Sequence, residues 1–189
     1  MKPLLALSRL IDAVNEYVGR AVYWLVLAAV LVSAANATMR YTFSISSNAW
    51  LETQWYLFAA VFLLCAGHTL LHNEHIRIDV VAGRLSRRTQ LWIDVFGTLF
   101  FLLPMALIIL WMSWPMFVES YVRNETSLNA GGLLRWPVKL LIPAGFLLLA
   151  LQGFSELIKR IAVLKGLIPD TVEKHVEPAL EVLADEINK

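Results

Sequence analysis

The chain has 189 residues, of which 58% are hydrophobic and 16% charged, and its formal net charge is +1. A mean hydropathy of +0.62 excludes an ordinary soluble domain, and we expect no nucleic-acid partner for so apolar and weakly charged a chain. The charges are also unevenly distributed. Asp, Glu, Lys and Arg are absent from four stretches: 21–39, 53–73, 95–118 and 140–155.

These charge-free stretches predict membrane spans. A membrane-spanning helix needs about 20 mostly apolar residues, and the first three stretches are long enough. The fourth is short, but 136–158 spans the bilayer if Lys139 and Glu156 sit at the interfaces and extend toward the headgroups. The sequence therefore predicts an all-α integral membrane protein with four transmembrane helices in one domain, residues 21–165.

Residues 1–20 predict an amphipathic helix that lies on the cytoplasmic side of the membrane before the first span. Apolar residues recur there every three or four positions, with Arg9, Asp12, Asn15 and Glu16 between them. The acidic residues also make this segment unlike the basic start of a signal peptide, so we expect the first span to be retained.

The first span carries a repeat of small residues and ends on a charge. Ala29, Ser33 and Ala37 recur every four positions, which lets a helix approach a neighbour closely, either within the bundle or in a partner subunit.

Arg40 closes this span and Glu52 opens the second, so both belong at one outer interface. There we expect an ion pair; alternatively, Glu52 satisfies its own helix N-terminus or faces a partner.

The second span ends in a run of candidate metal ligands. Cys65, His68, His72 and His75 share one helical face, but the helical rise separates the first and last by about 15 Å. At most an adjacent pair such as His68 and His72 could therefore bind a metal, with ligands from elsewhere. A bis-histidine haem needs a second buried histidine on another helix, and His175 lies in the tail. We expect no metal or cofactor in this chain, and a packed His68 hydrogen-bonded to a neighbouring helix.

The loop between the second and third spans is basic. Twelve Lys and Arg residues lie on the side of this loop and the termini, against four on the other side, which predicts that both termini are cytoplasmic. We expect Arg77, Arg84, Arg87 and Arg88 at the inner headgroup level, held by anionic lipid and by Asp79.

The last segment, residues 166–189, is predicted to be a short cytoplasmic tail with an amphipathic helix that Pro178 bends or interrupts.

The sequence contains no Gly-x-Ser-x-Gly motif, His-Glu-x-x-His motif or phosphate-binding glycine loop, so we expect no enzyme and no catalytic residues. Because no charge lies midway along any span, we also expect no substrate-binding site and no anion translocation by this chain alone.

One short motif carries a family resemblance. The run "HIRID" (75–79) resembles the loop after the second helix in the small membrane subunit of TRAP transporters, the DctQ-like family. Glu52 resembles a glutamate common at the start of that helix, and "LRWPVKLLIPAGFLLLALQG" (134–153) resembles the Pro-x-Gly opening of the last helix. The family's basic pair and glycine before the run are replaced here by Leu-His-Asn (71–73). The resemblance covers roughly residues 15–165.

This resemblance implies an accessory subunit of a tripartite ATP-independent, sodium-coupled uptake system for organic acids, in a bacterial or archaeal cytoplasmic membrane. A large membrane subunit would carry substrate and sodium, an extracytoplasmic solute-binding protein would deliver the solute, and this chain would widen and anchor the static scaffold. The alternative is a membrane anchor for a redox enzyme, which the missing second buried histidine disfavours. The candidate residues for a partner or lipid interface are Ala29, Ser33, Ala37, Arg40, Glu52, His75, Arg77, Asp79, Arg84, Arg87 and Arg88.

Overall fold

The structure, a computed structural model, describes residues 2–45, 47–72 and 85–169. Its helices are α1 (Lys2–Phe43), α2 (Asn48–Leu71), α4 (Arg87–Gly97), the π-helical turn η1 (Thr98–Leu102), α5 (Leu103–Val122) and α6 (Trp136–Leu164). Four helical segments are long and apolar enough to cross a membrane: α1, α2, the continuous run from α4 to α5, and α6. The predicted all-α fold with four spans is confirmed.

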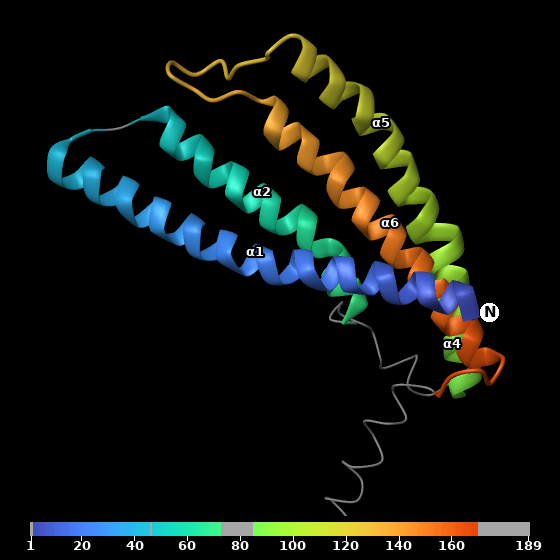
Figure 1. Cartoon of the computed structure of the whole chain (residues 1–189). Helices are drawn as coiled ribbons and strands as arrows, with labels where there is room; N and C mark the ends of the chain where they lie inside the picture. The colour runs from blue at the N-terminus through green and yellow to red at the C-terminus, as the bar shows by residue number, and fades with distance from the viewer. Residues whose placement is uncertain (1, 46, 73–84, 170–189) are drawn as a thin grey trace, which may run out of the picture.

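Helix α6 is the centre of the bundle. It packs against α1, α2, α4 and α5, and α1 also packs against α2. Half of its most apolar window is buried, against 11–17% for the other three spans. Figure 1 shows the resulting arrangement of two helical hairpins, α1–α2 and α5–α6, in which α6 lies between α2 and α5.

Small residues set the distance between these helices. A Cβ atom at Gly145 of α6 would lie 2.6 Å from the carbonyl oxygen of Leu63 on α2, so the glycine allows the two backbones to approach. One turn further along α6, Leu149 and Ala150 form a small core with Ala106 of α5, and Ala66 and Leu70 of α2 pack against it. Close backbone approach through small residues is the usual way that membrane helices associate.

Helix α1 is one continuous helix of 42 residues, so the predicted boundary between an interfacial segment (1–20) and the first span is not a break in the chain. Its length of about 63 Å far exceeds a hydrocarbon core of about 30 Å. The N-terminal half of α1 crosses the end of α6 (Figure 1). Its apolar Leu7 and Leu10 are exposed while its polar Ser8 and Asn15 are buried. The polar face of this half-helix therefore packs against protein, and its apolar face is left for lipid.

The third span contains a local change of helix type. Pro104 lies at the start of α5 and has no N–H group with which to continue the α-helical ladder. The turn before it widens into η1, where the N–H of Leu103 bonds to the carbonyl of Thr98. A π-helical turn thus accommodates the proline.

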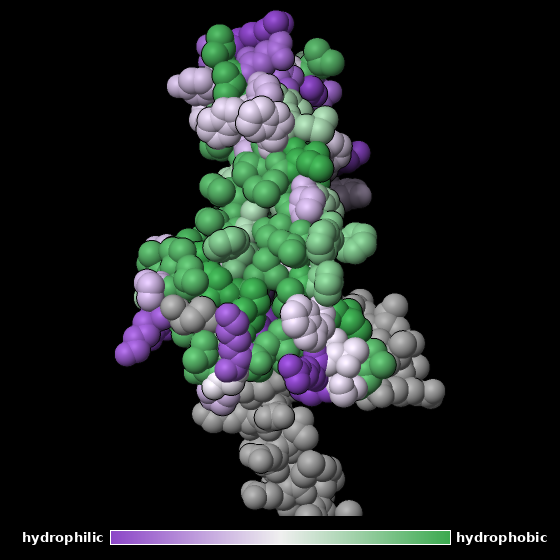
Figure 2. Space-filling model, turned by 90° about the vertical axis from the view of Figure 1, so that its right-hand side faces the viewer, coloured by the Kyte–Doolittle hydropathy of each residue, from purple (hydrophilic) through white to green (hydrophobic). Residues whose placement is uncertain are grey.

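The surface is divided along the bundle axis. Figure 2 shows hydrophobic residues over the middle of one face and hydrophilic residues toward its two ends. We call these the loop end, which carries the 123–135 loop between α5 and α6, and the N-terminal end, which carries the start of α1. Large apolar side chains such as Phe62, Phe101 and Trp111 are exposed between the two ends, so this surface requires lipid or a partner protein.

Candidate functional site

At the loop end, Glu52 organises the loop between α5 and α6. Its side chain lies one turn into α2 and is largely buried, with 7% of the residue exposed. The carboxylate accepts hydrogen bonds from the Ser127 hydroxyl, from Asn129 Nδ2 at 2.8 Å and from the backbone N–H of Leu133 at 2.7 Å. One carboxylate thus ties both limbs of the loop to α2.

The predicted ion pair between Arg40 and Glu52 is wrong. Arg40 is exposed in the last turn of α1, and the partners of Glu52 are the loop donors. Ser127 is 75 residues away from Glu52 along the chain. Sequence reasoning considered only the near side of the hairpin, because nothing local signals that the later loop folds back over α2.

A second carboxylate closes the base of the same loop. Glu125 pairs with Lys139 of α6, and Arg135 Nη1 lies 3.6 Å from its other oxygen. The hydrogen bond from the Lys139 ammonium holds the pKa of the Glu125 carboxyl below its usual range. Thr126 and Leu134 form an isolated antiparallel bridge across the loop, and the Tyr56 hydroxyl donates to the Leu134 carbonyl at 3.0 Å. Lys139 is therefore held by protein at the end of the span.

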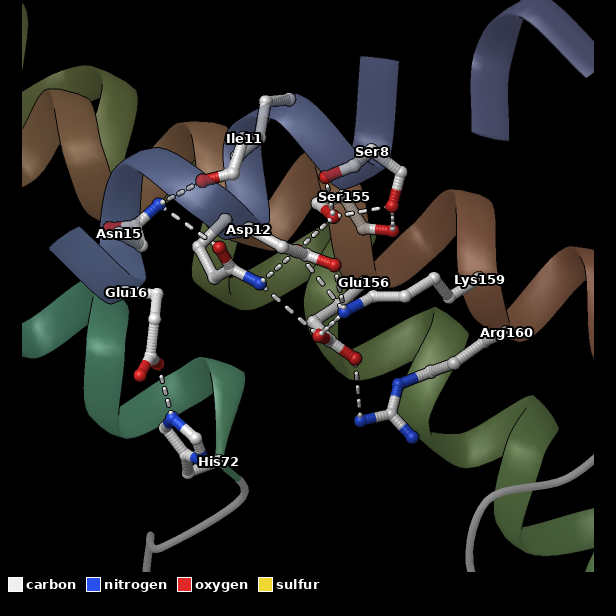
Figure 3. Close-up of polar contacts among 11 residues, drawn as sticks. Ser8, Ile11, Asp12, Asn15, Glu16, His72, Ser155, Glu156, Lys159 and Arg160 are labelled. Atoms are coloured by element: carbon white, nitrogen blue, oxygen red, sulfur yellow. Dashed lines mark hydrogen bonds and ion pairs between the residues drawn. The ribbon is translucent and has the colours of Figure 1, made fainter. Parts of the chain in front are cut away.

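At the N-terminal end, polar side chains of α1 and α6 form what we call the α1–α6 cluster (Figure 3). Gln152 at its centre is fully buried. Its Oε1 accepts from Asn15 Nδ2 at 3.0 Å, and its Nε2 donates to Asp12 Oδ1 at 2.9 Å. The Ser155 hydroxyl donates to the same Asp12 oxygen at 2.7 Å and lies 2.6 Å from the Ser8 hydroxyl.

Charged residues extend this cluster toward α4. Lys159 Nζ lies 3.1 Å from Asp12 and 2.5 Å from Glu156, and Arg160 pairs with Glu156 at 3.5 Å and with Asp94 of α4 at 2.5 Å. Glu156 is 5% exposed, so its carboxylate is covered by protein and turned toward these cations; that it sits at a membrane interface stays a prediction. The neighbouring cations compensate its charge inside the bundle, as burial of a carboxylate requires.

This cluster was missed as a unit by sequence reasoning, although a signal was present. Ser8, Asp12 and Asn15 are spaced by four and three residues and thus share one face of α1. Gln152, Ser155, Glu156 and Lys159 likewise share one face of α6. Two polar helical faces in an apolar chain predict each other as partners, because neither can be left in lipid. Chemically, the cluster fixes α1 to α6.

A third group lies between α1 and α2. Glu16 Oε2 is 2.8 Å from His72 Nε2 and 3.5 Å from His68 Nδ1. The other carboxylate oxygen, Oε1, accepts a hydrogen bond from Arg20 Nε at 2.8 Å. The predicted packing of His68 is confirmed, since it is buried and its Nε2 lies 3.5 Å from the Tyr23 hydroxyl of α1. Sequence reasoning allowed His68 and His72 to bind a metal only with a ligand from another segment, and Glu16 of α1 is the residue that lies beside both.

The other predicted interface residues that the structure describes lie in two places, on the second half of α1 and at the start of α4. Ala29 is buried, Ser33 is partly buried and Ala37 is exposed, so only the first part of the small-residue repeat packs inside the bundle. Arg87 is partly buried and Arg88 exposed, and both line an open hollow beside the end of α6. Outside the described residues lie His75, Arg77, Asp79 and Arg84.

Four membrane-crossing helices, with polar clusters confined to the two ends in the part of the chain that the structure describes, define a multi-pass membrane protein. The chain belongs to the family described as tripartite ATP-independent periplasmic transporters, DctQ component, which matches residues 29–163. This confirms the family resemblance: the chain is a TRAP transporter small subunit, a transporter component and not an enzyme. It also decides against the redox-enzyme anchor. No curated protein and no solved structure matches the chain.

The family match begins in the middle of α1 and ends near the end of α6. It includes all of the loop end and the α6 side of the α1–α6 cluster. The N-terminal half of α1, with Asp12 and Glu16, precedes the matched residues.

Proposed function

We propose that this chain is the accessory scaffold subunit of a sodium-coupled uptake system for organic acids. In this function a large permease subunit carries the solute and sodium ions, and a solute-binding protein delivers the solute from outside the membrane. The chain itself binds neither solute nor cofactor for transport. Its contribution is a rigid frame against which the permease works.

The observation that carries this proposal is where the charges lie. In the described residues, every charged side chain lies in the end regions of a span or in a loop, and 21–39, 53–71, 95–118 and 140–155 have none. A route for an anion would need ionisable groups or broken helix ends near the middle of the membrane. The two end clusters instead tie α1, α2 and α6 together, which suits a static support.

The charge asymmetry supports an orientation for this scaffold. We assign both termini to the cytoplasm of a bacterium or archaeon, with the loop end outside. Each basic residue near an anionic membrane surface contributes about 1 kcal/mol. Replacing Arg77, Arg84, Arg87 and Arg88 with glutamine should therefore lower membrane assembly or disturb topology, as read by reporters fused at the C-terminus and inserted in the 123–135 loop. Unchanged reporters and unchanged yield would contradict this orientation device.

The main test is co-purification followed by reconstitution. The chain is co-expressed with a large TRAP permease subunit from the same organism, and the complex is isolated in detergent through a tag on this chain. We expect recovery of both subunits and sodium-dependent uptake of an organic acid, with solute-binding protein added, only in liposomes containing both. Recovery of this chain as a homo-oligomer that transports solute by itself would overturn the proposal.

A further inference from the structure

The Glu16–His68–His72 group has the composition of a metal site. Two imidazoles and one carboxylate each offer a ligand atom, and these three atoms lie within 4.8 Å of one another. Ligands on a tetrahedral zinc ion lie about 3.4 Å apart, given bonds of about 2.0–2.1 Å. The 2.8 and 3.5 Å separations from Glu16 Oε2 to the two histidines bracket that value.

An independent observation concerns His68. Its side chain is 9% exposed, and its Nδ1 is buried without a hydrogen-bond partner, directed toward Glu16 Oε2 at 3.5 Å. An imidazole nitrogen left unpaired in an apolar bundle is costly. On the other side of the ring, Nε2 lies 3.5 Å from the Tyr23 hydroxyl, whose oxygen can accept a hydrogen bond from the Nε2–H group. That arrangement leaves the Nδ1 lone pair free for a metal and matches the outer hydrogen bond that metal-binding histidines make.

The backbone brings the three ligands together. His68 and His72 are four residues apart and so adjacent on one face of α2, with ring centroids 4.5 Å apart. Opposite them, Gly19 of α1 is so close that a Cβ there would lie 2.4 Å from the His68 ring. Because Gly19 admits this approach, Glu16, one turn earlier on α1, reaches both imidazoles.

From this geometry we propose that Glu16, His68 and His72 form a binding site for a divalent transition-metal ion of the zinc class, with three protein ligands and an open position for water. The ion would join α1 to α2 at the N-terminal end of the bundle. His72 is 44% exposed in its side chain, so the described residues leave the site open on one side. Arg20 bonds to the opposite Glu16 oxygen, and its charge lowers the affinity for a cation. The expectation from sequence, that this chain holds no metal, considered α2 without the carboxylate from α1.

The test measures Zn²⁺ binding to the full chain in detergent, purified through a tag free of histidine. A chromophoric chelator competes for the ion, and Co²⁺ serves as a spectroscopic probe of imidazole coordination. We expect one tight site in the wild type and a loss of affinity of more than tenfold, the lower bound for second-shell changes, in His72→Gln and Glu16→Gln. Arg20→Gln should bind Zn²⁺ more tightly. Saturating Zn²⁺ should raise the thermal stability of the wild type but not of His72→Gln.

His72 and Glu16 are used because their side chains are partly exposed, whereas His68 packs closely against Gly19, so its replacement would change helix packing as well as the site. The matched control is the double variant His75→Gln and His175→Gln, which removes the other two histidines and should retain wild-type affinity. Equal Zn²⁺ affinity in the wild type and in His72→Gln would overturn the proposal. Loss of binding in the control would also overturn it, because the ion would then be held elsewhere.

Discussion

The Asp12 carboxylate of α1 and the Lys159 ammonium of α6 lie 3.1 Å apart, joining residues that are 147 positions apart in the chain. Asp12 also accepts from Gln152 and Ser155, so three residues of α6 share it as an acceptor. This contact positions the N-terminal half of α1 across the end of α6.

Asp12→Asn should destabilise the protein by about 2–3 kcal/mol, because it leaves Lys159 beside a neutral amide and places a donor where donors converge. Unfolding in detergent, followed by tryptophan fluorescence against denaturant, measures the change. The control is Glu119→Gln, which breaks an exposed i,i+4 pair with Arg123 and should cost less than about 0.5 kcal/mol. Equal effects of the two variants would show that the cluster does not hold α1.

Glu52→Ala should release the 123–135 loop, because Ser127, Asn129 and Leu133 lose their common acceptor. Limited trypsin digestion of the folded protein in detergent should then cut faster after Arg123 or Arg135. The matched control is Arg40→Gln, which should digest like the wild type because the loop holds Glu52 without Arg40. Rescue of Glu52→Arg by adding Arg40→Glu would contradict this assignment.

Gly145→Ala should destabilise the bundle by about 1–3 kcal/mol, because the new methyl group would lie 2.6 Å from the Leu63 carbonyl oxygen and force α2 and α6 apart. Gly97→Ala is the comparison, since a Cβ at Gly97 has no neighbour within 4 Å. Alanine there should be neutral or stabilise the helix by up to about 1 kcal/mol. The measurement is the thermal unfolding of both variants. An unchanged stability of Gly145→Ala would refute close packing where α2 and α6 cross.

Acid should loosen the loop end through Glu125. In the folded protein the pKa of the Glu125 carboxyl lies below the ordinary glutamate value of 4.5, because Lys139 donates a hydrogen bond to the carboxylate. As the pH falls, the carboxyl of the unfolded chain therefore takes up its proton before the carboxyl of the folded chain does. The Glu125–Lys139 pair stabilises the protein above pH 4.5, and this stabilisation is lost as the pH falls through the lower folded-state pKa. The thermal stability of Glu125→Gln should lie below that of the wild type at pH 7, and the gap should narrow as the pH falls below 4.5. A difference in thermal stability between the two proteins that does not change with pH would exclude ionisation of Glu125 as the cause of that difference.

The number and placement of the spans follow from the sequence alone. In the described residues, the four charge-free stretches fall within α1, α2, the α4–α5 run and α6, apart from His72, which caps the end of α2, and Trp136 begins α6 as predicted. The physical reason is that a bilayer accepts only apolar segments of a certain length with all backbone hydrogen bonds made internally. That constraint acts on each segment separately, so it can be read from local composition. The family motif is likewise local.

The partners of the polar residues were decided only by the tertiary structure. Glu52 was paired with Arg40 by sequence reasoning, but it binds a distant loop. Glu16 was placed on an amphipathic surface, but it meets two histidines of α2. The cations that surround Glu156 were not predicted. Hydrogen bonds and ion pairs act over a few ångströms, so they depend on how the helices cross and on which small residues let them approach. Those crossings arise from contacts between residues far apart in the chain, which spacing along one helix does not encode.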